Sequence, residues 1–241
     1  MTNVMLAVAT AAALTGGGAL VFAPGAVKPP YSQVAYMDEQ AQIPPVRLII
    51  GLDLSKSNPL IDDPDFAAKV AARVSDSIRR LGLASEVHVR TFGSFDAGAN
   101  SYHYDAVISR FAPRDDVARH VENLIANTPV LVEHGQFHAQ NWTNILAFLE
   151  NMSRSIGCSG MPTVVILASD GIEDSELAHL DNPRDHLPVP DNRPFAGCAE
   201  LQILGIGQGT RSPSKTDRLR DEWARWAQEA GFGSFSGLND W

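Results

Sequence analysis

From Val46 onward, short apolar runs alternate with amphipathic stretches, and this alternation limits the folds that the chain can adopt. Central parallel strands are covered on both faces, so they form continuous apolar runs in a sequence. Three such runs occur, at 46–55, 162–170 and 201–207. Apolar residues at helical spacing predict amphipathic helices at 64–81, 115–126, 142–156 and 214–230.

Weaker signals complete the pattern. Three further strands are expected at 85–93, 106–113 and 233–238, and loops at 127–141 and 181–197. Strands that alternate with helices predict an α/β fold: an open, doubly wound, mostly parallel sheet with helices on both faces and one short antiparallel edge strand. Ligands of such sheets bind at the carboxyl ends of the strands, so that edge is where we look for chemistry.

The first 27 residues are not expected to belong to the folded domain. No charged residue occurs in 1–27, and the apolar stretch 4–27 is long enough to cross a bilayer as a helix. We expect an uncleaved signal anchor, with a cleaved signal peptide as the alternative, although a basic start and an A-x-A cleavage site are both missing. A Pro-rich linker, 28–45, then leads to the domain, 46–241. The domain would face the periplasm or the extracellular space.

The charge of the chain excludes one class of partner. The formal net charge is −9, and the longest basic run is the pair Arg79-Arg80. Nucleic-acid binding needs clustered Lys and Arg to contact phosphates, so no nucleic-acid partner is expected.

Oxygen-bearing side chains gather where two of the apolar runs end. Asp53, Ser55 and Ser57 follow the first run, and Asp170 follows the second. Alternate residues of an extended segment point the same way, so the first three can converge on one point. Carboxylate and hydroxyl oxygens are hard donors, which suit Mg²⁺, Ca²⁺ or Mn²⁺ rather than zinc or copper.

This pattern resembles the metal-ion-dependent adhesion site of von Willebrand factor A (VWA) domains. The resemblance rests on Asp53-x-Ser55-x-Ser57 after a buried strand, Thr143 at the start of a helix, and Asp170 after a hydrophobic strand. It covers roughly 46–241, but little chain is left for the final helix of the family.

Thr143 has a competitor for its place in this pattern. Thr128 lies in the same interval, but Pro129 follows it, whereas Thr143 leads directly into the apolar helix 142–156. We therefore assign the role to Thr143.

The resemblance implies a binding module rather than an enzyme. The five residues would hold one divalent cation, Mg²⁺ or alternatively Mn²⁺ or Ca²⁺. Neutral hydroxyls leave such a cation under-neutralised, so an open coordination position would accept an Asp or Glu of a protein partner. The loops 56–63, 137–142 and 171–176 would form the partner surface, and no small-molecule substrate is expected.

The two cysteines acquire a meaning from the same resemblance. In the family's strand order, the strands that follow Cys158 and Cys198 are neighbours, so both cysteines would lie at the amino edge of the sheet. They could then form a disulfide, which would agree with an oxidising compartment. Two free buried thiols are the alternative.

Two other functions remain open. Asp53 could be the nucleophile of a Mg²⁺-dependent phosphatase or phosphotransferase, although haloacid-dehalogenase-like enzymes need a second Asp where Ser55 stands. Alternatively, the chain is a structural subunit that has the fold but uses no metal. Glu173, Asp174 and Glu176 follow Asp170 closely and are interpreted as a solvated helix start.

Overall fold

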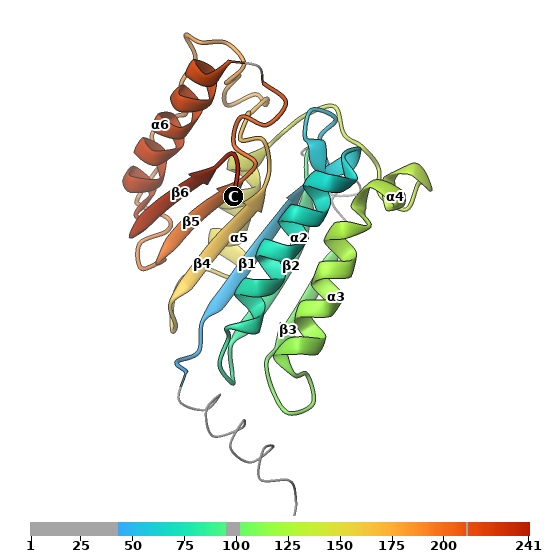
Figure 1. The fold of residues 1–241 in the computed structure, drawn as a ribbon. Helices are drawn as coiled ribbons and strands as arrows, with labels where there is room; N and C mark the ends of the chain where they lie inside the picture. Colours follow the sequence, from blue (N-terminus) through green and yellow to red (C-terminus); the bar gives the residue numbers. More distant parts are fainter. Residues whose placement is uncertain (1–42, 95–101, 211) are drawn as a thin grey trace, which may run out of the picture.

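The computed structural model describes residues 43–94, 102–210 and 212–241, which form one α/β unit around a six-stranded sheet (Figure 1). The strand order is β3-β2-β1-β4-β5-β6, and β2 and β3 form the antiparallel pair while the other neighbours are parallel. The predicted mostly parallel sheet with a short antiparallel edge strand is therefore confirmed.

The elements follow the predicted alternation. The strands are β1 (Arg47–Asp53), β2 (Glu86–Phe92), β3 (His103–Val107), β4 (Thr163–Ala168), β5 (Glu200–Leu204) and β6 (Ser234–Leu238). The helices are α2 (Pro64–Arg79), α3 (Arg114–Ala126), α4 (Thr128–Glu133), α5 (Ile145–Ser155) and α6 (Pro213–Ala230), and a short 3₁₀ turn, η1, spans Pro59–Ile61.

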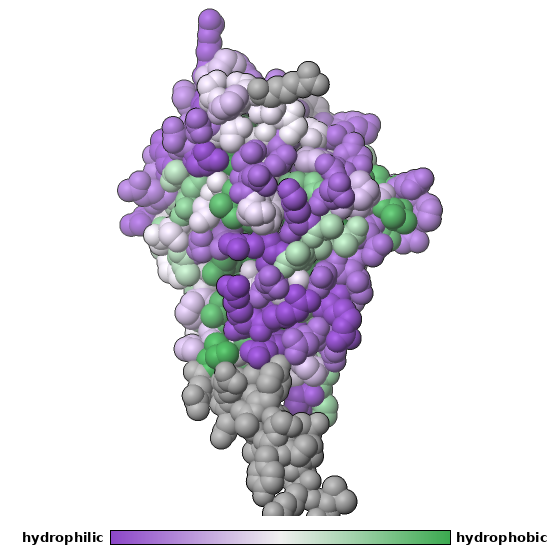
Figure 2. All heavy atoms as spheres, in the orientation of Figure 1, coloured by the Kyte–Doolittle hydropathy of each residue, from purple (hydrophilic) through white to green (hydrophobic). Residues whose placement is uncertain are grey.

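Two apolar layers hold the helices against the sheet. In Figure 1, α2 and α3 lie in front of β1 to β3, and α5 lies behind the sheet. In β1, Leu48 and Ile50 pack in the layer of α2 and α3, whereas Ile49 packs in the layer of α5 and α6. Because side chains of a strand point alternately to the two faces, a strand buried on both faces needs an unbroken apolar run, as β1 has. The side of the molecule drawn in Figure 2 is mostly hydrophilic, with small and separate hydrophobic areas.

Local chemistry sets the ends of the helices. Asp63 precedes α2, and its carboxylate accepts hydrogen bonds from the backbone N–H of Asp65 and of Phe66 at 3.0 and 3.1 Å. This is the capping arrangement that starts a helix, and Pro64 suits the first turn because it needs no hydrogen-bond partner. At its other end α6 stops at Gly231, whose φ of 100° belongs to the left-handed region. A Cβ there would meet the backbone N of Ala196 at 2.8 Å, so the position also needs a residue without a side chain.

Three sequence predictions need correction. The edge strand β3 occupies His103–Val107 rather than 106–113, because 109–112 forms a turn closed by a hydrogen bond from the Ser109 N–H to the Ala112 carbonyl (3.0 Å). The predicted loop 127–141 contains the short helix α4. Helix α5 begins at Ile145 rather than 142, because Asn144 caps it by accepting a hydrogen bond from the Ala147 N–H at 3.0 Å.

A disulfide joins Cys158 to Cys198, as the resemblance implied. The two Cα atoms are 5.1 Å apart, and the bond connects the turn before β4 with the turn before β5. Since β4 and β5 are parallel neighbours, the disulfide lies at the amino edge of the sheet, opposite the edge where the predicted ligands lie.

Within the described ranges, no helix combines the length and apolar character needed to cross a bilayer. The predicted anchor, 4–27, and all but the end of the predicted linker, 28–45, lie outside the described residues.

Candidate functional site

Two buried carboxylates lie at the carboxyl edge of neighbouring strands. Asp53 is the last residue of β1, and Asp170 follows the end of β4 by two residues. Their exposed fractions are 0% and 1%. One carboxylate oxygen of Asp53 accepts a hydrogen bond from the Ser55 N–H at 2.9 Å, and the other accepts one from the Ser169 hydroxyl at 2.8 Å. Asp170 accepts one from the Ile172 N–H at 2.9 Å.

The segment after β1 carries two hydroxyls toward this pair. The hydroxyl oxygens of Ser55 and Ser57 are 3.3 Å apart, and the Ser57 hydroxyl interacts with the carboxylate of Asp170. Asn58 fixes the segment, because its side-chain amide donates to the carbonyls of Asp53 and Ala168 at 2.8 and 3.0 Å. Ser55, Ser57 and Asp170 therefore meet at one point beside Asp53, whereas the sequence alone had identified neither Asn58 nor Ser169.

Burial and mutual repulsion shape the electrostatics of the pair. Burial, with a smaller contribution from the negative charge of Asp170, raises the pKa of Asp53 from 3.8 to about 7. Burial raises the pKa of Asp170 to about 6, against the opposing effects of the Ile172 N–H, the Ser57 hydroxyl and the positive charge of Lys215. Two ionised carboxylates in a site with little water need a positive charge between them.

Thr143 reaches the same edge through its backbone. The extended segment that carries it runs beside the segment after β1: the Gln140 N–H donates to the Leu54 carbonyl and the Lys56 N–H donates to the Gln140 carbonyl, both at 2.8 Å. Thr143 and Asp174 exchange backbone hydrogen bonds of 2.9 and 3.2 Å. Thr143, which is 2% exposed, is thus held between the segments that carry the other four predicted ligands.

The competing threonine has another role. Thr128 lies in α4, and its hydroxyl donates to the Leu124 carbonyl at the end of α3 (3.2 Å). Its hydroxyl therefore joins the start of α4 to the end of α3.

Glu173 is the residue that sequence reasoning misjudged. It is 0% exposed rather than solvated, and it follows β4 in a loop rather than at a helix start. One of its carboxylate oxygens accepts hydrogen bonds from the N–H groups of Ile145 and Leu146, at 2.7 and 3.2 Å, and the other accepts one from the Ser175 hydroxyl at 2.6 Å. Glu173 therefore joins the start of α5, just after Thr143, to the loop that carries Asp170.

The environment of Glu173 favours its uncharged form. Burial, opposed by these hydrogen bonds and reinforced slightly by the charge of Asp53, raises the pKa of Glu173 to about 8. No pattern in the sequence distinguishes this buried Glu from its exposed neighbour Glu176, because the difference depends on which amides lie opposite in the folded chain.

The donor set of the candidate site is rich in hydroxyls. Across 43–94, 102–210 and 212–241, no three His, Cys, Asp or Glu side chains form a group that could hold a metal ion. The candidate site instead combines two carboxylates with the hydroxyls of Ser55 and Ser57, and backbone pairing places Thr143 at the same edge. These hard oxygen donors fit Mg²⁺ or Mn²⁺, which bind through few carboxylates and keep other oxygen ligands.

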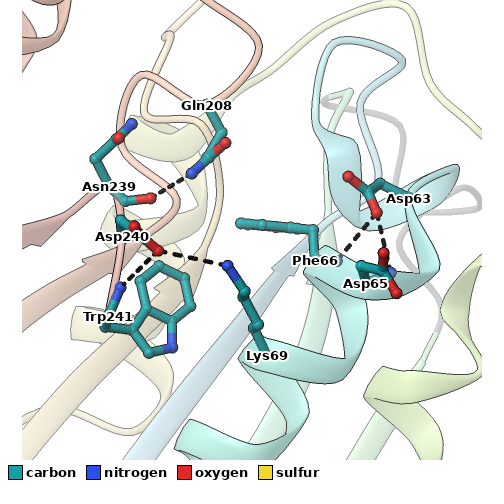
Figure 3. Close-up of a pocket in the computed structure, with 8 residues that line it drawn as sticks. All are labelled: Asp63, Asp65, Phe66, Lys69, Gln208, Asn239, Asp240 and Trp241. Carbon is teal, nitrogen blue, oxygen red and sulfur yellow. Dashed lines mark hydrogen bonds and ion pairs between the residues drawn. The ribbon is translucent and has the colours of Figure 1, made fainter.

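A separate crevice lies between the start of α2 and the last residues of the chain (Figure 3). It has a volume of about 100 Å³, and none of the predicted ligands lines it. Three of its charged groups already have partners: Asp63 caps α2, and Lys69 pairs with Asp240 at 3.4 Å. The crevice therefore offers fewer unpaired charged groups to a ligand than the Asp53 site does.

No family model matches the sequence, and no curated protein matches it significantly.

Proposed function

We propose that the chain contains a VWA-type domain that binds a divalent cation, preferably Mg²⁺, and uses it to hold an acidic residue of a partner protein. The ligands would be Asp53, Ser55, Ser57, Thr143 and Asp170. The observation that carries this proposal is the pair of buried carboxylates, Asp53 and Asp170, which meet at the carboxyl edge of the sheet with raised pKa values.

The hydrogen bonds around the pair support a role for the hydroxyls. Both carboxylate oxygens of Asp53 already accept hydrogen bonds from within the chain. The contact between the Ser55 and Ser57 hydroxyls, at 3.3 Å, is longer than the usual 2.7–2.8 Å of a hydroxyl pair. These two oxygens thus have no strong mutual hydrogen bond to give up when a cation binds.

A bound cation would supply positive charge and an open position for an anionic oxygen. The chain itself would orient the site: Asn58 and Glu173 hold the segments that carry the ligands, and the sheet fixes Asp53 and Asp170 relative to each other. Preorganised ligands lose little conformational entropy on binding, which favours affinity.

The same geometry favours binding over phosphoryl transfer. A nucleophilic carboxylate must contact the phosphorus of a substrate much larger than a metal ion, and Asp53 is 0% exposed. A test of hydrolysis with a simple phosphoester, in Mg²⁺, addresses this alternative directly.

We further propose that the domain lies outside the cytoplasm, behind a membrane anchor formed by residues 4–27. The disulfide between Cys158 and Cys198 supports this location, because disulfides persist mainly in oxidising compartments.

Calorimetric titration of the full chain with Mg²⁺ and Mn²⁺, in mild detergent, tests the proposal. The wild type should bind one ion, and Asp53→Ala should not. Asp63→Asn is the matched control: it removes a carboxylate from the same edge of the sheet, and Asn caps α2 as well as Asp does. Equal binding by wild type and Asp53→Ala, or no binding by either, would refute the metal site.

A further inference from the structure

Exposed apolar side chains stand beside the candidate cation site. Among the described residues, Trp142 is 52% exposed and Leu177 is 50% exposed. Trp142 immediately precedes Thr143, and Leu177 lies three residues beyond Asp174, the backbone partner of Thr143. Trp142 and Leu177 are therefore exposed on the two loops that the Thr143–Asp174 backbone pair joins.

The backbone holds Trp142 in place. Three residues close to it in the sequence are buried: Gln140, Thr143 and Asn144 are 5%, 2% and 4% exposed. The Asn144 N–H donates to the Gly93 carbonyl at 2.8 Å, and Gln140 pairs with the segment after β1 on both its N–H and its carbonyl. The indole is thus presented to solvent from a fixed segment.

Leu177 is presented in a comparable way, at the tip of a short turn. The Ser175 N–H donates to the Ala178 carbonyl at 3.0 Å, and the Leu177 N–H donates to the Ser175 hydroxyl at 3.1 Å. That hydroxyl in turn donates to Glu173 at 2.6 Å, which ties the turn to the start of α5. The exposed leucine is therefore positioned by a buried hydrogen-bond chain.

We propose that Trp142 and Leu177 form an apolar rim that selects a protein partner whose acidic residue has a large apolar neighbour. This inference rests on the proposed cation site. A cation would bind any accessible carboxylate, so it provides affinity without much specificity. Two exposed apolar side chains on the neighbouring loops would distinguish one carboxylate-bearing segment from another. Tryptophan is also enriched among the residues that dominate binding energy at protein interfaces.

Charge favours a protein segment over a lipid surface as the occupant. The chain has a formal net charge of −9, so an anionic membrane would repel it. A partner segment with one carboxylate and a neighbouring apolar side chain, in contrast, would bring a single negative charge to the cation and would pack its apolar side chain against Trp142 and Leu177. Burying that area is favourable because it removes apolar surface from water.

Selection from a random heptapeptide phage library tests the inference. The full chain would be immobilised in mild detergent and panned in Mg²⁺ and, in parallel, in EDTA. We expect the Mg²⁺-dependent peptides to contain Asp or Glu with Leu, Ile, Phe or Trp within two positions. Trp142→Ser and Leu177→Ser should each weaken binding of the best synthetic peptide about tenfold, while leaving Mg²⁺ binding by calorimetry unchanged.

Phe111→Ser is the matched control. Phe111 is 92% exposed but follows β3, whose last residue pairs with the first residue of β2 at the amino edge of the sheet. It should leave peptide binding unchanged. Mg²⁺ binding without apolar enrichment, or an equal loss in Phe111→Ser, would overturn the rim and leave the cation site standing. No Mg²⁺ response in the wild type would overturn both.

Discussion

Asp53→Asn should stabilise the metal-free protein at pH 8 although it removes a proposed ligand. Asn has nearly the same shape as Asp and can keep both local hydrogen bonds: its carbonyl oxygen accepts from the Ser55 N–H, and its amide donates to the Ser169 hydroxyl, which now donates to Asp53. The substitution therefore removes a buried negative charge without removing the local packing. Without a cation, burial and the negative charge of Asp170 disfavour that charge, and the hydrogen bonds from Ser55 and Ser169 offset this only in part.

The pKa of Asp53 gives the magnitude. Because its value in the folded protein is raised, the folded state resists ionisation, and stability is lost as the pH rises from 3.8 through about 7. The difference between a pKa of 3.8 and one of about 7 corresponds to roughly 4 kcal/mol in the free energy of unfolding. Asp170 shares this cost, since the two carboxylates repel each other, so we expect a gain of roughly 2–4 kcal/mol for Asp53→Asn at pH 8. For a domain of this size that is about 5–15 °C in the unfolding midpoint.

Thermal unfolding of both full chains in EDTA, followed by circular dichroism, measures this gain. The gain should shrink at pH 6 and again at pH 5, because the wild-type carboxyl is then protonated in the folded state. Mg²⁺ should raise the midpoint of the wild type at pH 8, because it binds only the folded site, and should leave that of Asp53→Asn nearly unchanged.

The opposite result would refute the reasoning. If Asp53→Asn is less stable than the wild type at pH 8 in EDTA, the ionised carboxylate is stabilised by the protein rather than strained by burial. If Mg²⁺ raises both midpoints equally, Asp53 is not part of a cation site.

Three further predictions concern the surroundings of the site. Glu173→Ala should lower the free energy of unfolding by about 1–3 kcal/mol, measured by denaturant unfolding, because it leaves buried N–H groups of α5 without acceptors, and it should weaken Mg²⁺ binding, measured by calorimetry. Glu173→Gln should lower stability and Mg²⁺ affinity less, and equal losses in the two variants would contradict the role of Glu173 as an acceptor. Replacing Cys158 and Cys198 together by Ser should cost about 2–4 kcal/mol in the same unfolding assay but leave Mg²⁺ affinity unchanged, because the disulfide lies at the opposite edge of the sheet; a parallel loss of Mg²⁺ affinity would show that the two edges are coupled. Lys215→Met should tighten Mg²⁺ binding severalfold at low ionic strength, because the positive charge of Lys215 acts on Asp170. High salt should abolish the difference in affinity measured by calorimetry, and unchanged affinity at low salt would place Lys215 too far from the ion to affect binding.

Periodicity made most of the fold predictable. The apolar run of β1 and the helical spacing in α2 are properties of neighbouring residues, so they can be recognised without knowing what each segment packs against. The same holds for Asp53, Ser55 and Ser57, because the end of a strand and the alternation of an extended segment are local features. Where helical propensity had to compete with long-range pairing, prediction failed: residues 140–144 pair with the segment after β1 and with Gly93, so α5 starts later than its apolar pattern indicates.

The sequence by itself determined the alternation of strands and helices and placed Asp53 and Asp170 at the carboxyl edge of the sheet; the ion that such oxygen donors would suit stays a prediction. Only the tertiary structure decided that Glu173 is buried while Glu176 is exposed, and that the loops carrying Trp142 and Leu177 are joined by the backbone pair of Thr143 and Asp174. The physical reason is how far apart in the sequence the interacting residues lie. Strands and helices arise from interactions between residues close in sequence, whereas burial of a carboxylate depends on hydrogen-bond donors that arrive from a segment about 28 residues away.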